Sequence, residues 1–288
     1  MRTLKLARFS DRCVFVCTFV LLRGISSDNL LTPSPIGAGR DNAQTGKTMP
    51  RPATMRKRSP SSARALPSGL VILYEDRDIL VASKPAGLLT IATEAEKERT
   101  AYFILTDYVR KGYAKSRKRL FIVHRLDRET SGVLVFAKSE EAKRRLQGQW
   151  EDTAKTYLAV VHGRCEKSAD TITTYLAENR NHVVYSTTDS AKGKLSHTAY
   201  KALKRAKDVS LLEVRPLTGR KNQIRVHLAG IGHPIVGDRK YGTGGDTHTR
   251  LALHARSIAF RHPFSGQTVA FEAEAPPFFN NLVGDMGK

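Results

Sequence analysis

The sequence predicts an α+β domain with a mostly antiparallel mixed sheet flanked by helices. Strand-like apolar runs follow one another along the chain, whereas helical spacing of apolar residues recurs in only three segments. Neighbouring strands with few helices between them favour antiparallel pairing, because parallel strands need a long crossover connection. We expect one folded domain at residues 69–288, preceded by a disordered basic extension at residues 1–68.

The extension differs in composition from the rest of the chain. Residues 24–68 are rich in Ser, Pro, Gly, Thr and Arg and lack periodicity, which is typical of disorder. Residues 13–22 form an apolar run that is too short to span a bilayer. Three interpretations stay open for this start: a signal-like segment, an organellar transit peptide, or untranslated sequence ahead of Met49 or Met55. We expect a cytoplasmic protein, or an organellar one if the segment is a transit peptide.

The folded part is expected to begin with two strands and a helix. Residues 70–74 and 79–83 are apolar runs on either side of a charged turn, a pattern that predicts paired strands. Residues 100–111 predict a helix, because Thr100 can cap its start, apolar residues recur at helical spacing and Gly112 can end it.

The central segment, residues 121–138, consists of two apolar runs around a polar turn that contains His124-Arg-Leu-Asp127. Catalytic groups often occupy such turns, because the flanking strands fix a loop that would otherwise move. Residues 139–150 predict a second helix, with Ser139 as its N-cap and two glutamates in the first turn.

The remaining elements are mostly strands. Residues 222–230 predict a third helix from the spacing of their apolar residues. Strands are expected at residues 155–161, 198–203, 210–215, 252–260 and 268–273.

The net charge is far from balanced. The chain has 48 Lys and Arg against 27 Asp and Glu, a formal charge of +21. Residues 1–66 account for +9 of this charge, which leaves +12 for the rest. Such an excess of basic residues favours a polyanion partner, most often nucleic acid, over a merely solubilising surface. One basic cluster, residues 111–119, ends just before the polar turn and suggests a phosphate-binding rim.

The motif search excludes several classes of chemistry. The three cysteines, Cys13, Cys17 and Cys165, provide neither a disulfide framework nor a four-ligand zinc site. No Gly-x-Ser-x-Gly turn, His-Glu-x-x-His helix or dinucleotide-binding glycine motif occurs in the sequence. We therefore expect chemistry that needs no metal and no cofactor.

Asp127 is the strongest candidate for that chemistry. It is the only carboxylate of the His124–Asp127 tetrapeptide and lies between Arg125 and Arg128, which favour its ionised form. On local chemistry alone, a structural ion pair is the commoner explanation of such a residue. Four further segments are ambiguous by themselves, since each also fits an ordinary turn, strand or solvated helix: Lys84–Leu88, Lys155–Tyr157, Arg215–His227 and Gly232–Gly242.

Taken together, these segments resemble the RluA-type family of RNA pseudouridine synthases. The resemblance runs from about Leu70 to Phe279, and its most specific blocks are His124-Arg-Leu-Asp127 and Gln223-Ile-Arg-Val-His227. Other matching blocks are Lys84-Pro-Ala-Gly87, Thr130-Ser-Gly132, Lys155-Thr-Tyr157, Thr218-Gly-Arg220, Gly232–Asp238 and Leu253-His-Ala255. The resemblance implies the pseudouridine synthase catalytic fold for residues 69–288 and an isomerisation of a specific uridine in structured RNA without a cofactor.

The resemblance also implies roles for individual residues. Asp127 matches the essential aspartate, Tyr157 the tyrosine that stacks on the target base, and Arg225 the basic partner of the aspartate. The residues expected to bind substrate RNA are Arg125, His124, Arg220, Lys84 and His227. We expect a monomer that acts on ribosomal RNA rather than transfer RNA and does not bind a membrane.

Three departures and two alternative functions remain. The extension shows no sign of the S4-type RNA-binding domain that many relatives carry, Asn222 stands where many relatives have His, and residues 88–93 differ from the commonest version of the segment. One alternative is a non-catalytic RNA-binding protein on the same scaffold. The other is a glycoside or nucleoside hydrolase, which needs a second carboxylate opposite the first, with Glu129 a candidate by proximity only.

Overall fold

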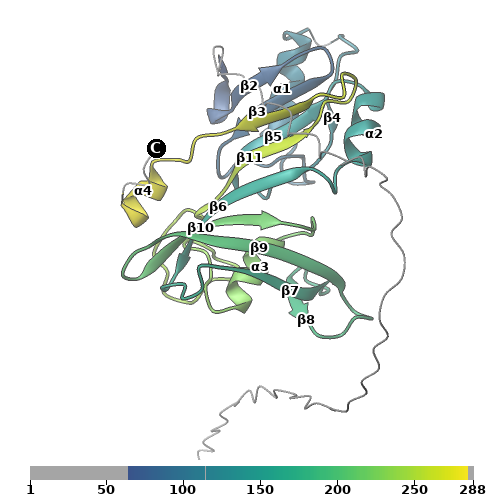
Figure 1. Ribbon diagram of the computed structural model, residues 1–288. Helices are drawn as coiled ribbons and strands as arrows, with labels where there is room; N and C mark the ends of the chain where they lie inside the picture. Colours follow the sequence, from purple (N-terminus) through teal and green to yellow (C-terminus); the bar gives the residue numbers. More distant parts are fainter. Residues whose placement is uncertain (1–63, 114, 285–288) are drawn as a thin grey trace, which may run out of the picture. The chain divides into compact units, whose positions relative to one another are not determined.

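A computed structural model describes residues 64–113 and 115–284, and within these residues the strands form one mixed sheet (Figure 1). The strands are β1 (Arg64–Ala65), β2 (Val71–Glu75), β3 (Ile79–Lys84), β4 (Phe121–Ile122), β5 (Ser131–Ala137), β6 (Ala154–His162), β7 (Ala169–Glu178), β8 (Val184–Thr187), β9 (Lys194–Arg205), β10 (Val209–Pro216), β11 (Leu253–Arg261) and β12 (Thr268–Glu272). The helices are α1 (Ala101–Arg110), α2 (Glu140–Gly148), α3 (Gln223–Gly230) and α4 (Phe278–Val283), with a 3-10 turn at Pro67–Gly69.

The strand order confirms the predicted fold class. The sheet runs β1-β2-β3-β5-β11-β6-β10-β9-β7-β8, with β4 also paired to β5 and β12 to β11. Among these pairs only β5 and β11 are parallel, and all the others are antiparallel. β6 joins the two halves of the sheet, because it pairs with β11 on one side and β10 on the other.

Helices cover both faces of the first half of the sheet. In β3 and β5, Leu80 and Phe136 pack in the cluster that contains α1, whereas their neighbours Val81 and Val135 pack in the cluster that contains α2. This alternation follows from the period of two in a strand. Every residue of β5 is buried as a result. The loop that precedes β5 therefore ends at a strand that is held firmly in the core.

The two predicted helix starts are confirmed. The Thr100 side chain accepts a hydrogen bond from the Phe103 amide, and the Ser139 side chain accepts one from the Ala142 amide. These caps satisfy amides that have no partner within the helix. α1 ends where Lys111 adopts a left-handed conformation, one residue before Gly112.

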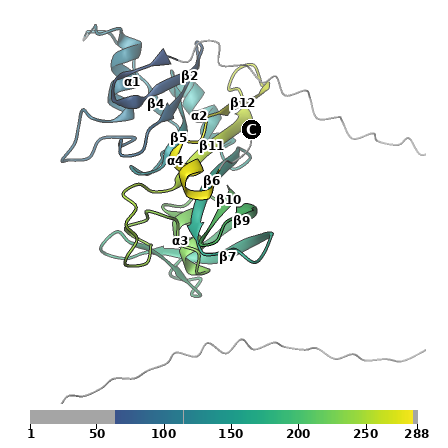
Figure 2. The same ribbon diagram turned by 90° about the vertical axis from the view of Figure 1, so that its left-hand side faces the viewer.

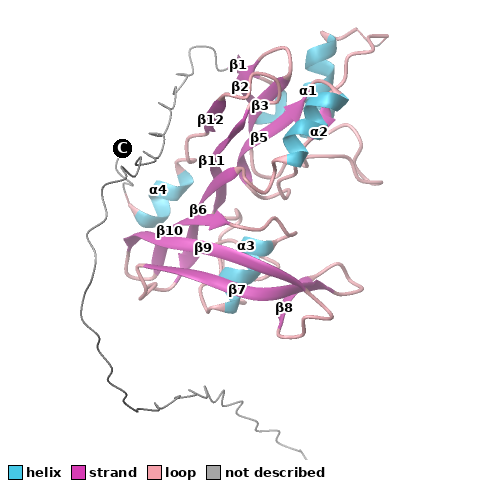
Figure 3. Cartoon of the chain, turned by 45° about the vertical axis from the view of Figure 1, so that its right-hand side comes forward, coloured by secondary structure: helices cyan, strands magenta, loops and turns pink. Residues whose placement is uncertain are grey.

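The second half of the sheet is built from β6, β10, β9, β7 and β8, and α3 packs against it (Figure 2). Leu158, Leu212 and Val214 of β6 and β10 form its core with Leu228 of α3 and Phe279 of α4. The secondary-structure colours of Figure 3 show α3 beside these strands, far from α1 and α2.

Three elements of this half were absent from the sequence prediction. In β7 only Ile172 and Leu176 pack in core clusters, and in β8 only Val184 does, so neither strand shows a continuous alternation of apolar and polar residues. α4 is only six residues long, too short for helical spacing to be recognised.

The described fold begins earlier than the predicted boundary at residue 69. Arg64 and Ala65 pair with Ile72 and Val71 of β2. The predictions for residues 1–63, including the apolar run at residues 13–22, lie outside the described residues. Within the described part, no helix is long and apolar enough to cross a membrane.

Gly132 allows the parallel pairing of β5 with β11. Its φ of +118° lies in the region that favours glycine, and it pairs with Ala255 of β11. A Cβ atom at this position would overlap the Ala255 backbone. The loop that carries Asp127 is therefore joined to the sheet at a point where no other residue fits.

We predict that Gly132→Ala destabilises the protein by more than about 3 kcal/mol, because backbone overlap is added to an unfavourable φ. Gly148→Ala is the matched control. Gly148 lies in α2, where a Cβ would meet nothing within 4 Å, so this change should be neutral or stabilising by up to about 1 kcal/mol. Urea unfolding measures both variants, and similar free energies of unfolding for the two would contradict the prediction.

Candidate active site

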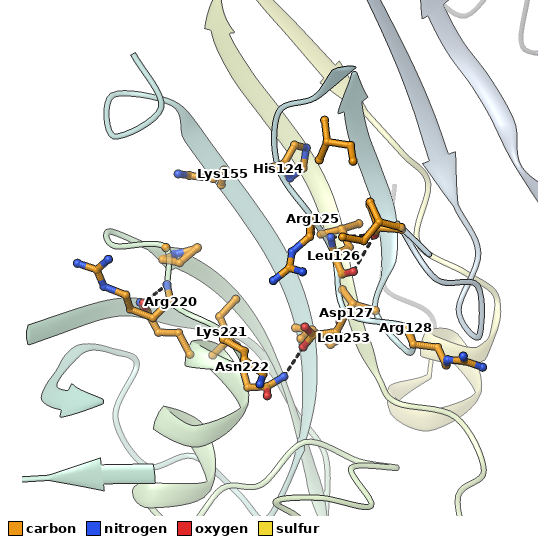
Figure 4. Close-up of a pocket in the computed structure, with 18 of the residues that line it drawn as sticks. His124, Arg125, Leu126, Asp127, Arg128, Lys155, Arg220, Lys221, Asn222 and Leu253 are labelled. Carbon is orange, nitrogen blue, oxygen red and sulfur yellow. Dashed lines mark hydrogen bonds between the residues drawn. The ribbon is translucent and has the colours of Figure 1, made fainter. Parts of the chain in front are cut away.

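A pocket of about 710 Å³ is lined by residues from both halves of the sheet. Its walls come from the loops at residues 89–93, 122–130 and 216–222, from the start of α3, and from Lys155 and Tyr157 of β6 (Figure 4). Six of the eight site residues predicted from the sequence line this pocket: His124, Arg125, Asp127, Tyr157, Arg220 and Arg225. Lys84 and His227 do not.

Backbone hydrogen bonds on both sides of Asp127 hold its loop in place. The Thr90 hydroxyl donates to the Leu126 carbonyl at 2.8 Å and accepts from the Leu126 amide at 3.2 Å. On the other side, the Arg128 carbonyl accepts from the Gly87 amide at 2.9 Å and from Lys84 Nζ at 3.0 Å. These hydrogen bonds join the loop at residues 85–93 to the loop that carries Asp127.

Lys84 is a structural residue, so the prediction that it binds RNA is wrong. It is 1% exposed, and its ammonium group donates to three carbonyls, those of Pro85, Leu88 and Arg128. Burial lowers the pKa of Lys84 to about 7, although the nearby carboxylates of Glu129 and Asp127 act in the opposite direction. With all three donors engaged in the backbone, Lys84 positions the Asp127 loop.

Arg225 brings α3 to the carboxylate of Asp127. Its Nη1 lies 3.4 Å from Asp127 Oδ2, whereas its Nε and Nη2 each donate to Asp238 at 2.7 Å. Burial acts to lower the pKa of Arg225, but Asp238 and Asp127 outweigh it and raise that pKa. Burial likewise acts to raise the pKa of Asp238, yet the bonds from Arg225 keep it below its ordinary value. The stronger ion pair is thus Arg225–Asp238, and Asp127 is the looser partner.

Asn222 makes the shortest contact to Asp127. Its Nδ2 donates to Asp127 Oδ2 at 2.6 Å, as Figure 4 shows. From the sequence, Asn222 was recognised only as a departure from relatives, and no function was expected for Asp238. No local pattern reveals either contact, because each joins segments far apart in the chain.

Tyr157 lies at the junction of two core clusters. It packs against both the cluster of α1 and the cluster of β6 and β10, and its side chain lines the pocket. Burial, together with the charge of Asp127, raises the pKa of Tyr157 above its ordinary value. The phenol is therefore neutral at physiological pH and can present an aromatic face.

His124 lines the pocket but cannot supply a positive charge to RNA. Its Nε2 accepts a hydrogen bond from the Val135 amide at 3.0 Å, and its ring lies 4.7 Å from that of Trp150. Burial, with a smaller effect of Lys155, lowers the pKa of His124 to about 3. The neutral ring connects the Asp127 loop to β5.

His227 is buried behind the pocket, so its predicted contact with RNA is also wrong. Its two ring nitrogens lie 2.9 Å from the Thr198 hydroxyl and 3.1 Å from the Thr174 hydroxyl. Burial lowers the pKa of His227 to about 4, and His197 adds to this shift. It joins α3 to β7 and β9.

Basic side chains surround the pocket. Arg125, Lys155, Arg220 and Lys221 all line it, and Figure 4 shows Arg125 extending toward the loop that carries Arg220. Within residues 64–113 and 115–284, neither Arg125 nor Arg220 forms an ion pair. Their guanidinium groups are therefore available to the phosphates of a polyanion.

Asp127 is the only carboxylate among the residues that line the pocket, and Glu129 is not one of them. The pair of opposed carboxylates that a glycoside hydrolase needs is thus missing from the described pocket. Elsewhere, Asp76, Asp78 and His262 place possible metal ligands within 4.8 Å of one another. Both oxygens of Asp76 already accept hydrogen bonds, which close the turn between β2 and β3.

Known proteins are similar to this chain in sequence and in fold. A family model described as RNA pseudouridylate synthase matches residues 78–230. The chain is 37% identical over 218 residues to YhcT, an uncharacterized RNA pseudouridine synthase of Bacillus subtilis, covering 74% of this chain and 71% of the relative. It is 33% identical over 220 residues to the ribosomal large subunit pseudouridine synthase D of Zymomonas mobilis, covering 72% and 69%. The structure of human RNA pseudouridylate synthase domain containing 1 superposes with a TM-score of 0.59 at 27% identity, covering 74% of this chain and 86% of that one.

We predict that Asp238→Asn lowers the free energy of unfolding by about 3–5 kcal/mol, because Arg225 would remain buried without its main counter-charge. Glu272→Gln, which removes a surface partner of Arg256, should change it by less than about 1 kcal/mol. Urea denaturation at neutral pH compares the two variants. Equal losses would show that the buried pair is no more important for stability than a surface one.

We predict that stability falls as the pH drops below about 6.5. Burial lowers the pKa of His124 to about 3 and those of His227 and His254 to about 4, so the unfolded chain binds protons first. The contribution of these histidines is complete above pH 6.5 and decreases toward pH 4, by at most about 1.4 kcal/mol per histidine and pH unit. Thermal unfolding between pH 7.5 and 5 measures the slope. His227→Gln should flatten it, and an unchanged slope would contradict this explanation.

Proposed function

Because the chain belongs to the RNA pseudouridylate synthase family, it is an isomerase that acts on uridine in RNA, and we propose that Asp127 is its essential catalytic group. The observation that carries this proposal is the position of Asp127. It is the only carboxylate lining the described pocket, it lies against Arg225, and hydrogen bonds to Leu126 and Arg128 fix its loop on both sides.

The isomerisation breaks the bond between N1 of uracil and C1′ of the ribose and forms a bond between C5 and C1′. Asp127 acts on the ribosyl group, either by attacking it or by removing a proton from it. The base rotates before it rejoins, C5 loses a proton and N1 gains one, so atoms balance without a co-reactant. Arg225 keeps the carboxylate ionised for this step, since an opposite charge nearby favours the charged form.

The target uridine must leave its stack before Asp127 can reach the sugar, at a cost of roughly a few kcal/mol. Stacking on Tyr157 offsets part of this cost, since a base on an aromatic side chain typically gains roughly 1–3 kcal/mol. Arg125 holds the place that the flipped nucleotide leaves, and Arg220 contacts the phosphate backbone. Both side chains are exposed at the pocket and free of ion pairs within the described residues.

We propose ribosomal RNA rather than transfer RNA as the substrate, modified by a monomer in the cytoplasm. The support for ribosomal RNA is that relatives of similar identity are named ribosomal large subunit pseudouridine synthases. Pseudouridine mapping across total RNA, with and without this protein, tests the choice. Loss of a site in ribosomal RNA supports it, whereas loss of a site only in transfer RNA overturns it.

We predict that Asp127→Asn abolishes pseudouridine formation but changes RNA affinity less than about threefold, because phosphate contacts dominate binding. Asp208→Asn, an exposed aspartate in the turn between β9 and β10, is the control and should retain full activity. Mapping in cells that express each variant measures the product. Full activity of Asp127→Asn would refute the proposed role, and release of free uracil by the native protein would indicate a hydrolase.

A further inference from the structure

Asn222 has an unusual backbone conformation for its position. It precedes α3 with φ +53° and ψ 15°, the left-handed region that few residues other than Gly, Asn and Asp adopt. An Asn at a helix start usually accepts a hydrogen bond from an amide of the first turn, but the Asn222 side chain makes no such bond. It reaches Asp127 on the opposite side of the pocket instead.

The orientation of the Asn222 amide is fixed by the groups behind it. The Val184 amide, which can only donate, lies 3.2 Å from the Tyr241 hydroxyl oxygen. The hydroxyl proton of Tyr241 is therefore free to point at Asn222 Oδ1, also 3.2 Å away. Since Oδ1 accepts from Tyr241, Nδ2 must face Asp127, where it lies 2.6 Å from Oδ2. In this series of hydrogen bonds each residue donates to the next one, and the last acceptor is the Asp127 carboxylate.

Asn222 and Arg225 restrain the same oxygen of Asp127. Both approach Oδ2, at 2.6 Å and 3.4 Å, and no described residue donates a hydrogen bond to Oδ1. Oδ2 is thus the anchored oxygen, and Oδ1 is left for the substrate. The Asp127 side chain remains 35% exposed, so a substrate can approach it.

We propose that Asn222 is a positioning residue that aims Oδ1 of Asp127 at the ribosyl group through the chain Val184–Tyr241–Asn222. This inference rests on the proposed catalytic role of Asp127. Arg225 supplies charge but is held mainly by Asp238, whereas Asn222 supplies direction without neutralising the carboxylate. Chains of hydrogen bonds strengthen one another in a protein interior, which favours one carboxylate orientation over others.

Two variants separate positioning from folding. Asn222→Gly removes the side chain and accepts the left-handed backbone without strain, so the fold should be kept. Asn222→Asp keeps the shape but replaces the donor with a second carboxylate. The assay uses total RNA from cells that lack this protein, with pseudouridine at the lost site as the readout.

We expect Asn222→Gly to lower kcat by about 10- to 100-fold, the loss typical of one hydrogen bond to a charged group, with KM changed less than about threefold. Asn222→Asp should be less active at pH 8 and recover as the pH falls toward 5, because a proton shared by the two carboxyl groups restores a donor. The charged or titratable groups around Asp127 are Arg125 and Arg128 of its own loop, Lys84 of β3, Tyr157 of β6, Arg225 of α3, and Tyr241 and Asp238 beside Arg225. All of them are present in the native protein and in both Asn222 variants, so the native pH profile is the reference for their contribution.

A double-mutant cycle with Tyr241→Phe tests the chain itself. Removing the Tyr241 hydroxyl should lower kcat in the native background but have little further effect in Asn222→Gly, because the two changes break one path. Tyr108→Phe, which removes a hydroxyl bonded to Glu75 outside the pocket, is the control and should leave kcat unchanged. If the losses of kcat in the two single variants add up in the double variant, the proposed hydrogen-bond chain Val184–Tyr241–Asn222 is refuted.

Asp127→Asn, assayed alongside, keeps the two proposals distinguishable. If it is fully active, the proposed function fails whatever Asn222 does. If it is inactive while both Asn222 variants retain the native kcat and pH profile, only the positioning inference fails.

Discussion

Arg225 is buried with two of its nitrogens bound to Asp238, and its third reaches the only carboxylate that lines the described pocket. A buried guanidinium needs a full counter-charge, because removing an ion from water costs several kcal/mol. Asp238 meets that need, so Asp127 does not have to. The carboxylate of Asp127 stays close to a positive charge without being fully neutralised by it, which suits the catalytic role proposed for it. The Arg225–Asp238 pair fixes α3 against the loop that carries Asp238, and the contact of Arg225 with Asp127 joins α3 to the loop before β5.

The sheet supplies the rigidity that this arrangement requires. β6 joins the two halves, so Tyr157 and Lys155 on this strand lie between the Asp127 loop and the start of α3. Burial of every residue of β5 and the parallel pairing at Gly132 hold one wall. The other wall is held by Leu228 and its neighbours in the core beneath α3. Displacement of either half would change the 2.6 Å contact between Asn222 and Asp127.

The sequence allowed much of the fold to be predicted, because alternation in strands and capping residues are local signals. Thr100 and Ser139 begin their helices as expected. The site was harder to predict. Lys84 and His227 stand in blocks that resemble those of a known family, as Asp127 does, yet they bond only within the protein. A motif does not distinguish a residue that supports a site from one that faces the substrate. Asp238 and Asn222 were missed for the converse reason, since their importance lies in contacts with residues 13 and 95 positions away, which only the tertiary structure creates.

The electrostatics of the pocket also explain why a strongly basic protein can use a lone acidic group. Burial keeps His124 neutral, Lys84 donates to backbone carbonyls, and Arg225 binds mainly to Asp238, so no nearby cation neutralises Asp127 fully within the described residues. The exposed cations Arg125 and Arg220 have no ion-pair partner in the described chain, which leaves them for phosphates. Hydrolysis of a glycosidic bond would also require a group to activate water, and no second carboxylate lines the described pocket. A single carboxylate that accepts a hydrogen bond from an amide and shares its pocket with an aromatic ring fits the proposed reaction, in which the detached base returns to the same sugar.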